Sequence, residues 1–242
     1  MLARILLLLF FLVLNSTAVS SGKEASTTTA TTVSAKNTDN KICPHLQVLD
    51  DKTRISTLNS HNCRRALLAQ GHTKSKNGKS LPQASNMLEL QYNCSLEFSA
   101  FISATRCSTK PWMPSGSGIQ ENIHSVPKSK AKKPLYAIFE ALTHWWYQIK
   151  SDGSVYRSLK YTGYRKGNPI TWFTRMAWAT TEYVGCAVHS CKNNRWSVVC
   201  HYSPGGNKKN EPIYKKGPPC SACRCGYYCS AGKLCARNST AT

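Results

Sequence analysis

The cysteines constrain this chain more than any other feature. Twelve of them follow a leader that has one basic residue, Arg4, and an unbroken apolar run over residues 5–14. Such a run is typical of a signal peptide and is too short to cross a bilayer comfortably, so we expect cleavage near residue 20 rather than an uncleaved anchor. An even number of cysteines behind a signal peptide indicates an oxidising, extracellular location and a fold held by disulfides.

Composition divides the chain that follows the signal peptide (residues 1–20) into three parts. Residues 21–42 are rich in threonine and serine and lack the apolar side chains needed to fold, so we expect a flexible arm. Residues 43–210 carry the apolar periodicity of a folded domain. Residues 211–242 hold five cysteines between Cys220 and Cys235 and few core-forming side chains, which predicts a small disulfide-held lobe. We expect no transmembrane segment in the mature chain.

Periodicity and capping residues predict three helices and a hairpin. The first helix begins at Asp50 or Asp51 and ends at Gly71; its inner face is predicted to hold Ile55, Leu58, Asn62, Arg65 or Ala66, and Ala69. The second is capped by Ser95 and ends near Cys107, and the third starts at Pro134. Two β-prone segments, 183–191 and 195–203, are predicted to pair. Helices and strands do not alternate regularly, so a parallel α/β fold is not expected.

Several separate motifs resemble those of the CAP family, the cysteine-rich secretory, antigen 5 and pathogenesis-related proteins. They are HNCRR at 61–65, QENI at 120–123, PITWFTRMAWATT at 169–181 and VVCHYSPGGN at 198–207. The chain is most similar to the nematode branch, which includes hookworm activation-associated secreted proteins and venom allergen-like proteins. The resemblance implies an α+β fold: an α-β-α sandwich with an antiparallel central sheet and a small cysteine-rich C-terminal hinge. It also implies a structural role for His61.

The resemblance also implies disulfides. It pairs Cys107 with Cys191 and Cys186 with Cys200, and Cys43 with Cys94 is the third pair that we expect. The hinge cysteines Cys220, Cys223, Cys229 and Cys235 would form two bridges among themselves. Cys63 and Cys225 are extra to the family pattern, so we expect them to pair with each other. Zinc ligation by the clustered hinge cysteines is the alternative, but thiols in an oxidising compartment are more often paired.

Many CAP domains carry two histidines and two glutamates in a central cleft, and some bind zinc there. Here residues 108–120, which would supply the first histidine, contain none. Glu121 remains, but Gln148 stands at the second glutamate position and Trp172 at the second histidine position. Gln148 carries no charge, Trp172 offers only an N–H donor, and His124 would be a lone imidazole. We therefore expect no metal, no cofactor and no catalytic residue.

Without catalytic chemistry, binding functions remain. The leading hypothesis is engagement of an extracellular protein, such as a host or immune component. The alternative is a sterol or fatty-acid carrier that uses the Tyr156–Tyr164 loop and the groove between helices. Tyr156, Tyr161 and Tyr164 have the aromatic spacing of the caveolin-type loop in sterol-exporting CAP proteins, which the chain resembles here. Ordinary packing of these tyrosines is the competing interpretation.

Charge and glycosylation signals complete the predictions. The net charge of +21 either keeps the protein soluble or attracts a polyanion such as a glycosaminoglycan. Nucleic acid is not expected as a partner of a secreted chain that has no recognisable binding motif. Sequons at Asn93 and Asn238 predict N-glycosylation.

Overall fold

The structure, a computed structural model, describes residues 40–112, 117–151, 155, 158–163 and 170–238, all within a unit that spans residues 37–242. The predicted signal peptide and nearly all of the predicted arm lie outside the described residues. In order, the elements are α1 (Asp51–Ala69), β1 (Gln91–Tyr92), α2 (Cys94–Thr105), β2 (Gln120–Pro127), α3 (Pro134–Tyr147), η1 (Gln148–Lys150), α5 (Thr171–Ala177), β3 (Tyr183–Cys191), β4 (Arg195–Ser203), β5 (Tyr227–Cys229) and β6 (Cys235–Arg237).

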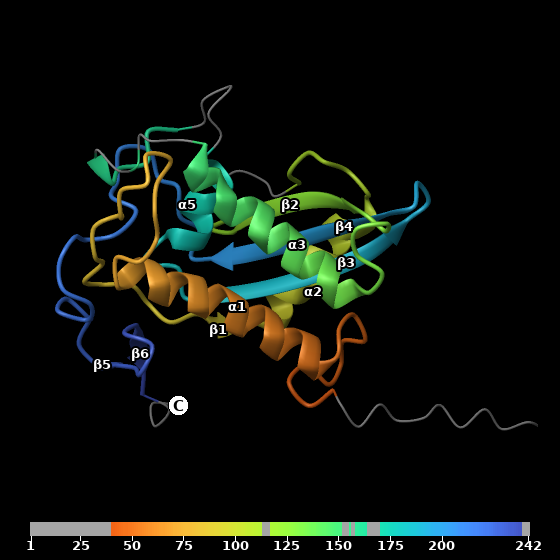
Figure 1. Ribbon diagram of the computed structural model, residues 1–242. Coiled ribbons are helices and arrows are strands. Elements are labelled where there is room, and N and C mark those ends of the chain that lie inside the picture. The colour runs from red at the N-terminus through yellow and green to blue at the C-terminus, as the bar shows by residue number, and fades with distance from the viewer. Residues whose placement is uncertain (1–39, 113–116, 152–154, 156–157, 164–169, 239–242) are drawn as a thin grey trace, which may run out of the picture. The chain divides into compact units, whose positions relative to one another are not determined.

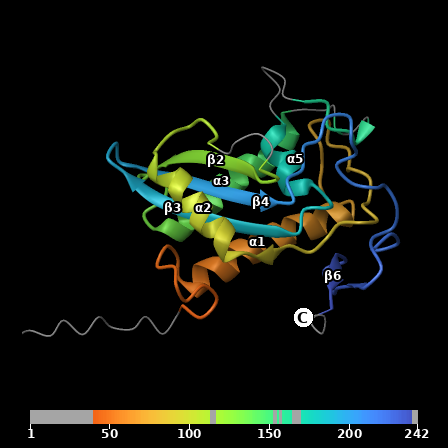
Figure 2. The same ribbon diagram turned by 180° about the vertical axis from the view of Figure 1, so that it is seen from behind.

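The elements form the three-layer α-β-α sandwich that the resemblance implied. Figure 1 shows α1, α3 and α5 on one face of the sheet, and Figure 2, seen from behind, shows α2 on the other face. The sheet has the order β1-β3-β4-β2. β2, β4 and β3 are antiparallel, which confirms the predicted hairpin, but the short β1 pairs parallel to β3. Within the described residues, no helix has the length and apolar character needed to cross a membrane.

The buried face of α1 agrees with the prediction at Arg65 and Ala69 but differs from it elsewhere. Ile55 is 49% exposed, whereas Arg54, Thr57, His61, Arg65 and Leu68 are buried. The Arg54 guanidinium donates two hydrogen bonds, each of 2.7 Å, to the Glu97 carboxylate of α2. Arg65 donates to the carbonyls of Leu88, Met176 and Trp178 at 2.7 to 3.0 Å. Because these buried polar groups are paired, the helix joins the other layers through hydrogen bonds as well as through apolar contact.

The helix ends agree with the prediction except at α2. Asp50 caps α1 by accepting from Thr53 N at 2.6 Å, and Pro134 lies in the first turn of α3. α2 is capped by Asn93 rather than Ser95, since the Asn93 side chain accepts from Leu96 N at 2.9 Å. This helix lies tightly on β3, because a Cβ at Gly185 would be only 2.2 Å from the backbone nitrogen of Glu97.

The hinge packs against the main domain. Leu234 is buried in the same apolar cluster as Leu68 and Ala69 of α1. The backbone N–H of Cys235 donates to Met87 O at 2.8 Å, and the N–H of Glu89 donates to Cys235 O at 2.9 Å. The small β5–β6 hairpin is therefore attached to the segment that precedes β1.

Five disulfides join the pairs Cys43–Cys94, Cys107–Cys191, Cys186–Cys200, Cys220–Cys229 and Cys223–Cys235. The first three are the pairs that were predicted for the domain, and the last two are bridges among the four hinge cysteines that were predicted to pair with one another. The predicted pair Cys63–Cys225 is wrong, because both cysteines are unbonded and exposed. Cys63 lies on the outer face of α1, and Cys225 lies in the solvent-exposed turn before β5.

Candidate functional site

Strand β2 distributes the predicted cleft residues over two faces of the sheet. In the register, Glu121 lies opposite His201 of β4, and Asn122 lies opposite Cys200. Successive side chains of a strand point to opposite faces. Glu121 therefore faces α2, while Asn122 and His124 face α3 and α5. Glu121, Gln148 and Trp172 were predicted to share one cleft, but only Gln148 and Trp172 are hydrogen-bonded to each other.

On the α2 face, Glu121 belongs to a sealed hydrogen-bonded chain. Its Oε2 accepts from His201 Nε2 at 2.8 Å, its Oε1 accepts from the Trp112 N–H at 2.9 Å, and the Ser99 hydroxyl lies 2.7 Å from His201 Nδ1. Glu121 is 2% exposed and His201 is fully buried. Burial alone would raise the pKa of Glu121, but the hydrogen bonds from His201 and Trp112 outweigh it and the pKa is lowered. Glu121 is thus a buried anion whose acceptor positions are occupied.

Ser99, His201 and Glu121 are the residue types of a hydrolase triad, and the sequence analysis identified neither Ser99 nor His201 in this role. The geometry around Ser99 does not complete such a site. Ser99 lies in the middle of α2, and its single hydroxyl proton is within reach of both His201 Nδ1 at 2.7 Å and Leu96 O at 3.1 Å. The neighbouring N–H groups lie inside the helix, where each bonds a carbonyl one turn earlier, so they are not free to stabilise an oxyanion. Only the β2–β4 register brings Glu121 to His201, and no local sequence signal specifies that register.

On the opposite face, Gln148 and Trp172 form a structural contact. The buried Gln148 Oε1 accepts from the backbone N–H groups of Trp172 at 2.8 Å and Phe173 at 3.1 Å. Asn122 Nδ2 donates to Trp172 O at 3.0 Å. The first N–H groups of a helix have no intrahelical partner, so the Gln148 amide caps α5. The side chain at the glutamate position thus holds the signature helix in place.

Beside Trp172, the structure brings together two histidines that the sequence analysis did not associate. The rings of His124 and His144 stack with centroids 3.9 Å apart and an interplanar angle of 14°, and the His144 centroid is 5.4 Å from that of Trp172. Burial, helped by the charges of His144 and Arg195, lowers the pKa of His124 to about 4. The pKa of His144 is lowered as well, mainly by burial. His144 lies one helical turn before Gln148. This spacing is the sequence signal that could have placed His144 near Gln148 and Trp172.

The residues present do not fit the zinc site of the resemblance. In stacked rings the nitrogen lone pairs lie in nearly parallel planes, so His124 and His144 cannot both point at one ion about 2.0–2.1 Å from each nitrogen. Within the described ranges, two groups of three donor atoms lie close together: His61, Cys186 and Cys200, and Cys220, Cys223 and Cys235. The cysteines of both groups are in disulfides and offer no thiolate.

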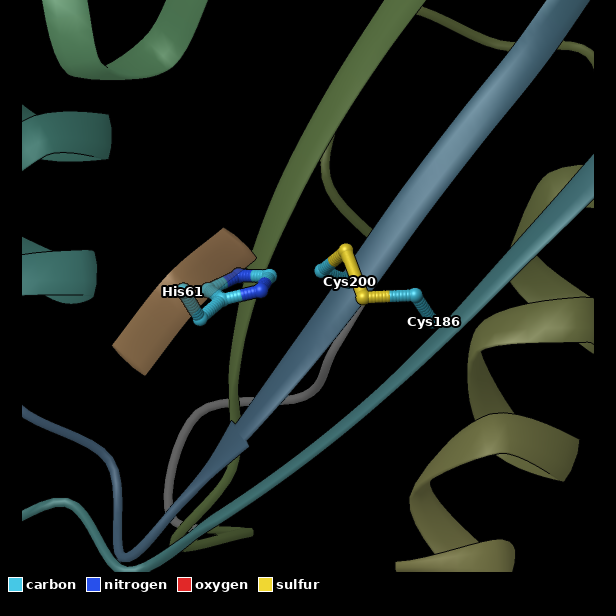
Figure 3. Close-up of side chains that lie close together, drawn as sticks. All are labelled: His61, Cys186 and Cys200. Carbon is cyan, nitrogen blue, oxygen red and sulfur yellow. A yellow bond between two sulfur atoms is a disulfide. The ribbon is translucent and has the colours of Figure 1, made fainter. Parts of the chain in front are cut away.

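His61 has a structural environment, as the resemblance implied. Figure 3 shows its ring beside the Cys186–Cys200 disulfide. Its Nδ1 lies 2.9 Å from Thr57 O and must donate to it, so Nε2 accepts from the Tyr202 hydroxyl at 3.0 Å. Complete burial lowers the pKa of His61 to about 4. Both ring nitrogens are therefore occupied in a neutral imidazole.

The predicted sterol loop is only partly within the described residues. Tyr156 and Tyr164 lie outside them. Tyr161 is 8% exposed and belongs to the apolar cluster that contains Phe173. Its backbone bonds to Asn210 and Glu211, and its hydroxyl is 3.4 Å from Thr171 Oγ1. Tyr161 therefore packs in the core instead of presenting its face to a lipid.

The two sequons have different environments. Asn93 is half-buried and its side-chain oxygen caps α2, whereas Asn238 is exposed just after β6. Attachment at Asn93 must therefore leave its side-chain oxygen free to cap the helix. Asn238 has no such constraint.

Comparison with known proteins places these observations in context. The sequence profile described as "CAP: Cysteine-rich secretory protein family" matches residues 58–202. Ancylostoma secreted protein from Ancylostoma caninum is 34% identical over 200 residues, which cover 79% of this chain but only 45% of that longer protein. Hookworm platelet inhibitor 1 from the same organism is 31% identical over 198 residues, covering 81% of this chain and 84% of that protein. The solved structure of NaASP2 with Zn²⁺ superposes with a TM-score of 0.71 at 32% identity, covering 78% of this chain and 97% of that one.

Proposed function

The chain belongs to the cysteine-rich secretory protein (CAP) family, and on that premise we propose that it is a secreted protein that acts by binding an extracellular protein partner, without catalysis. The observation that carries the proposal is the use of the cleft residues for internal contacts. The Glu121 carboxylate accepts hydrogen bonds from the His201 ring and the Trp112 N–H, and the Gln148 amide oxygen accepts from a backbone N–H in the first turn of α5. Neither side chain is free to move a proton to or from a substrate.

Secretion is supported by the leader, by the disulfides and by the relatives. Five disulfides among the described residues require an oxidising compartment. A protein partner is supported by the relative whose name is that of a platelet inhibitor, since this chain covers most of its length.

The outer face of α2 offers an apolar surface for such a partner. Phe98 and Ile102 are 50% and 38% exposed, and residues four apart on a helix are neighbours on one face. Adjoining exposed apolar side chains are candidate contacts for a protein partner. This face lies on the side of α2 that points away from the sheet.

The experiment is a capture from extracellular fluid with the immobilised full chain, identification by mass spectrometry, and titration of the captured protein by surface plasmon resonance. We expect saturable binding that weakens at least about tenfold in a Phe98→Ser/Ile102→Ser variant, as loss of an interface anchor commonly does. The matched control is Ile55→Ser/Leu67→Ser on α1, where the side chains are 49% and 44% exposed. Equal weakening in both variants, or no saturable ligand, would contradict the proposal.

Absence of catalysis is tested separately. We expect Ser99 to remain unlabelled by a fluorophosphonate probe, because its hydroxyl points into the network with His201 and Leu96. Labelling that disappears in Ser99→Ala and His201→Gln would reverse the non-catalytic assignment.

The alternative, a sterol or fatty-acid carrier, has weaker support because Tyr161 is buried. Titration with radiolabelled cholesterol of the wild type and of a Tyr156→Ala/Tyr161→Ala/Tyr164→Ala variant decides it. Saturable binding that this variant loses, with its circular dichroism unchanged, would favour the carrier.

A further inference from the structure

One end of the sheet gathers basic side chains from two segments that are distant in sequence. The β2–β4 register places Pro127 opposite Arg195, and the Lys128 N–H donates to Asn194 O at 3.1 Å. The β2–α3 loop is thereby joined to the β3–β4 turn, and both views show them at the same end of the sheet (Figures 1 and 2). We call this surface the basic end; it consists of Lys128, Lys130, Lys132, Lys133, Lys192 and Arg195.

Most of the charge at the basic end is uncompensated. Lys130, Lys132, Lys133 and Lys192 are exposed. Lys130 lies 3.8 Å from Glu140, but both side chains are largely exposed, so the pair contributes little. No carboxylate of the described residues forms an ion pair with Lys132, Lys133 or Lys192. Like charges held close together without counterions attract a polyanion through long-range electrostatics and release of its bound cations.

Trp196, the aromatic side chain beside the basic end, already makes contacts within the protein. The Lys128 ammonium lies 4.7 Å from the Trp196 ring centroid and donates to Ser190 Oγ at 2.6 Å. The Trp196 indole N–H donates to Ala131 O at 2.7 Å. The indole is therefore held against the protein and is not free to insert into a bilayer or to stack on a base. A charged and polar surface of this kind fits a polysaccharide better than a membrane or a nucleic acid.

A hollow adjoins the basic end at the β3–β4 turn. It has a volume of about 420 Å³ and is lined by the Cys107–Cys191 disulfide together with Thr105, His189, Ser190, Lys192 and Asn193; most of the exposed lining is apolar. The hollow is on the α2 side of the sheet, since His189 packs against Phe101 of α2, whereas the Lys128–Ser190 contact is on the α3 side. Lys192, at the turn between the two strands, belongs to both surfaces. The volume falls within the range of ~300–1,000 Å³ that small-molecule sites occupy. The lining supplies hydroxyl, amide, imidazole and ammonium groups for the hydroxyl and sulfate oxygens of a sugar.

We propose that the basic end binds a sulfated polysaccharide of the glycosaminoglycan class. Sulfate groups along the chain pair with the exposed lysines, and one sugar unit lies in the hollow beside Lys192 and Asn193. The inference adds a second class of partner to the proposed function and uses a different surface from Phe98 and Ile102. It shares with that function only the extracellular location.

The test compares two variants that lose the same charge. Lys130→Ser/Lys132→Ser/Lys133→Ser/Lys192→Ser removes the basic end, and Lys208→Ser/Lys209→Ser/Lys215→Ser/Lys216→Ser removes four exposed lysines elsewhere. Affinity for heparin is measured by calorimetry at several salt concentrations, and circular dichroism checks the folding of each protein. We expect the first variant to bind at least roughly tenfold more weakly and with a shallower salt dependence, since each lost ionic contact lowers that slope by about one. The control should change by less than about threefold, because only distant charge is lost.

Two outcomes overturn the proposal. Equal weakening in both variants would show that overall charge, not this surface, attracts the polyanion. Binding of phosphatidylserine vesicles that matches heparin binding and is lost in the first variant would assign the surface to membranes. The hollow is tested separately with a short sulfated oligosaccharide. Asn193→Ala and Thr105→Val should lower the affinity for this oligosaccharide more than they lower the affinity for long heparin. If the affinity for the oligosaccharide is unchanged, the hollow is not part of the site. Phe98→Ser/Ile102→Ser keeps every lysine, so failure of the protein-partner proposal is distinguished from failure of this one.

Discussion

The two faces of strand β2 differ although their residues are neighbours in sequence. On the α2 face, Glu121 is sealed with His201 and Ser99, and its acceptors are satisfied. On the α3–α5 face, His124 stacks on the more exposed His144 beside the half-buried Trp172. This contrast shows that neighbouring residues of one motif can have separate structural surroundings, because strand alternation sends their side chains to opposite layers. Both faces use their polar groups to hold the fold, one by a buried ion and the other by neutral contacts.

The largest expected effect comes from breaking the sealed face. Glu121→Ala leaves the buried His201 without its acceptor, and we expect a loss of about 3 kcal/mol in the free energy of unfolding, as for a buried charged hydrogen bond. Urea denaturation measures the change. The pKa of Glu121 is lowered from 4.5 in the folded protein, so its stabilisation is present above pH 4.5 and is lost as pH falls through the folded pKa. Glu121→Gln should lack this acid-dependent loss; an acid profile identical to that of the wild type would count against the buried anion.

A smaller effect is expected on the opposite face. Gln148→Ala removes the cap of α5 and should cost about 1–2 kcal/mol, in the range measured for helix caps. Hydrogen exchange should rise at the Trp172 and Phe173 amides, which Gln148 accepts from. Gln148→Glu keeps an acceptor at the same place and serves as the control. Unchanged exchange in Gln148→Ala would show that the cap is not made in solution.

Ser99→Ala should lower the free energy of unfolding by about 1 kcal/mol, because it leaves Nδ1 of the buried His201 without its partner while Glu121 and His201 remain paired. Thermal unfolding is sufficient to measure it. A loss as large as that of Glu121→Ala would contradict this, because it would mean that Glu121 and His201 do not stay paired without Ser99.

At neutral pH the smallest effect is expected for His124→Phe. The folded pKa of His124 is lowered from 6.5 to about 4, so the histidine adds no pH dependence above pH 6.5, and protonation of the unfolded state erodes stability as pH falls from 6.5 towards 4. His124→Phe should therefore reduce the slope of the stability profile in that window, where His61, whose pKa is also lowered to about 4, contributes the remaining slope. The window lies above the one expected for Glu121, so the two faces are separable by pH. Histidine titration by NMR with a pKa of His124 near 6.5 would contradict this.

Sequence patterns predicted the elements better than their contacts. Pro134, Asp50 and the β3–β4 hairpin were predictable because each depends on neighbouring residues. The buried face of α1 was not, since Arg54 meets Glu97 only after the chain has folded. For the same reason, motif positions identified Glu121, Gln148 and Trp172, but the separation of Glu121 from the other two depends on strand register. His144 was within reach of local reasoning, because it lies one turn before Gln148 on α3.

The central claim is that Glu121 serves the fold and not a metal. Its most direct test is a calorimetric titration of the tag-free protein with zinc, in parallel with Glu121→Gln. We predict no binding tighter than micromolar in either protein. Stoichiometric binding below micromolar in the wild type, lost in Glu121→Gln while the fold is retained, would contradict the claim.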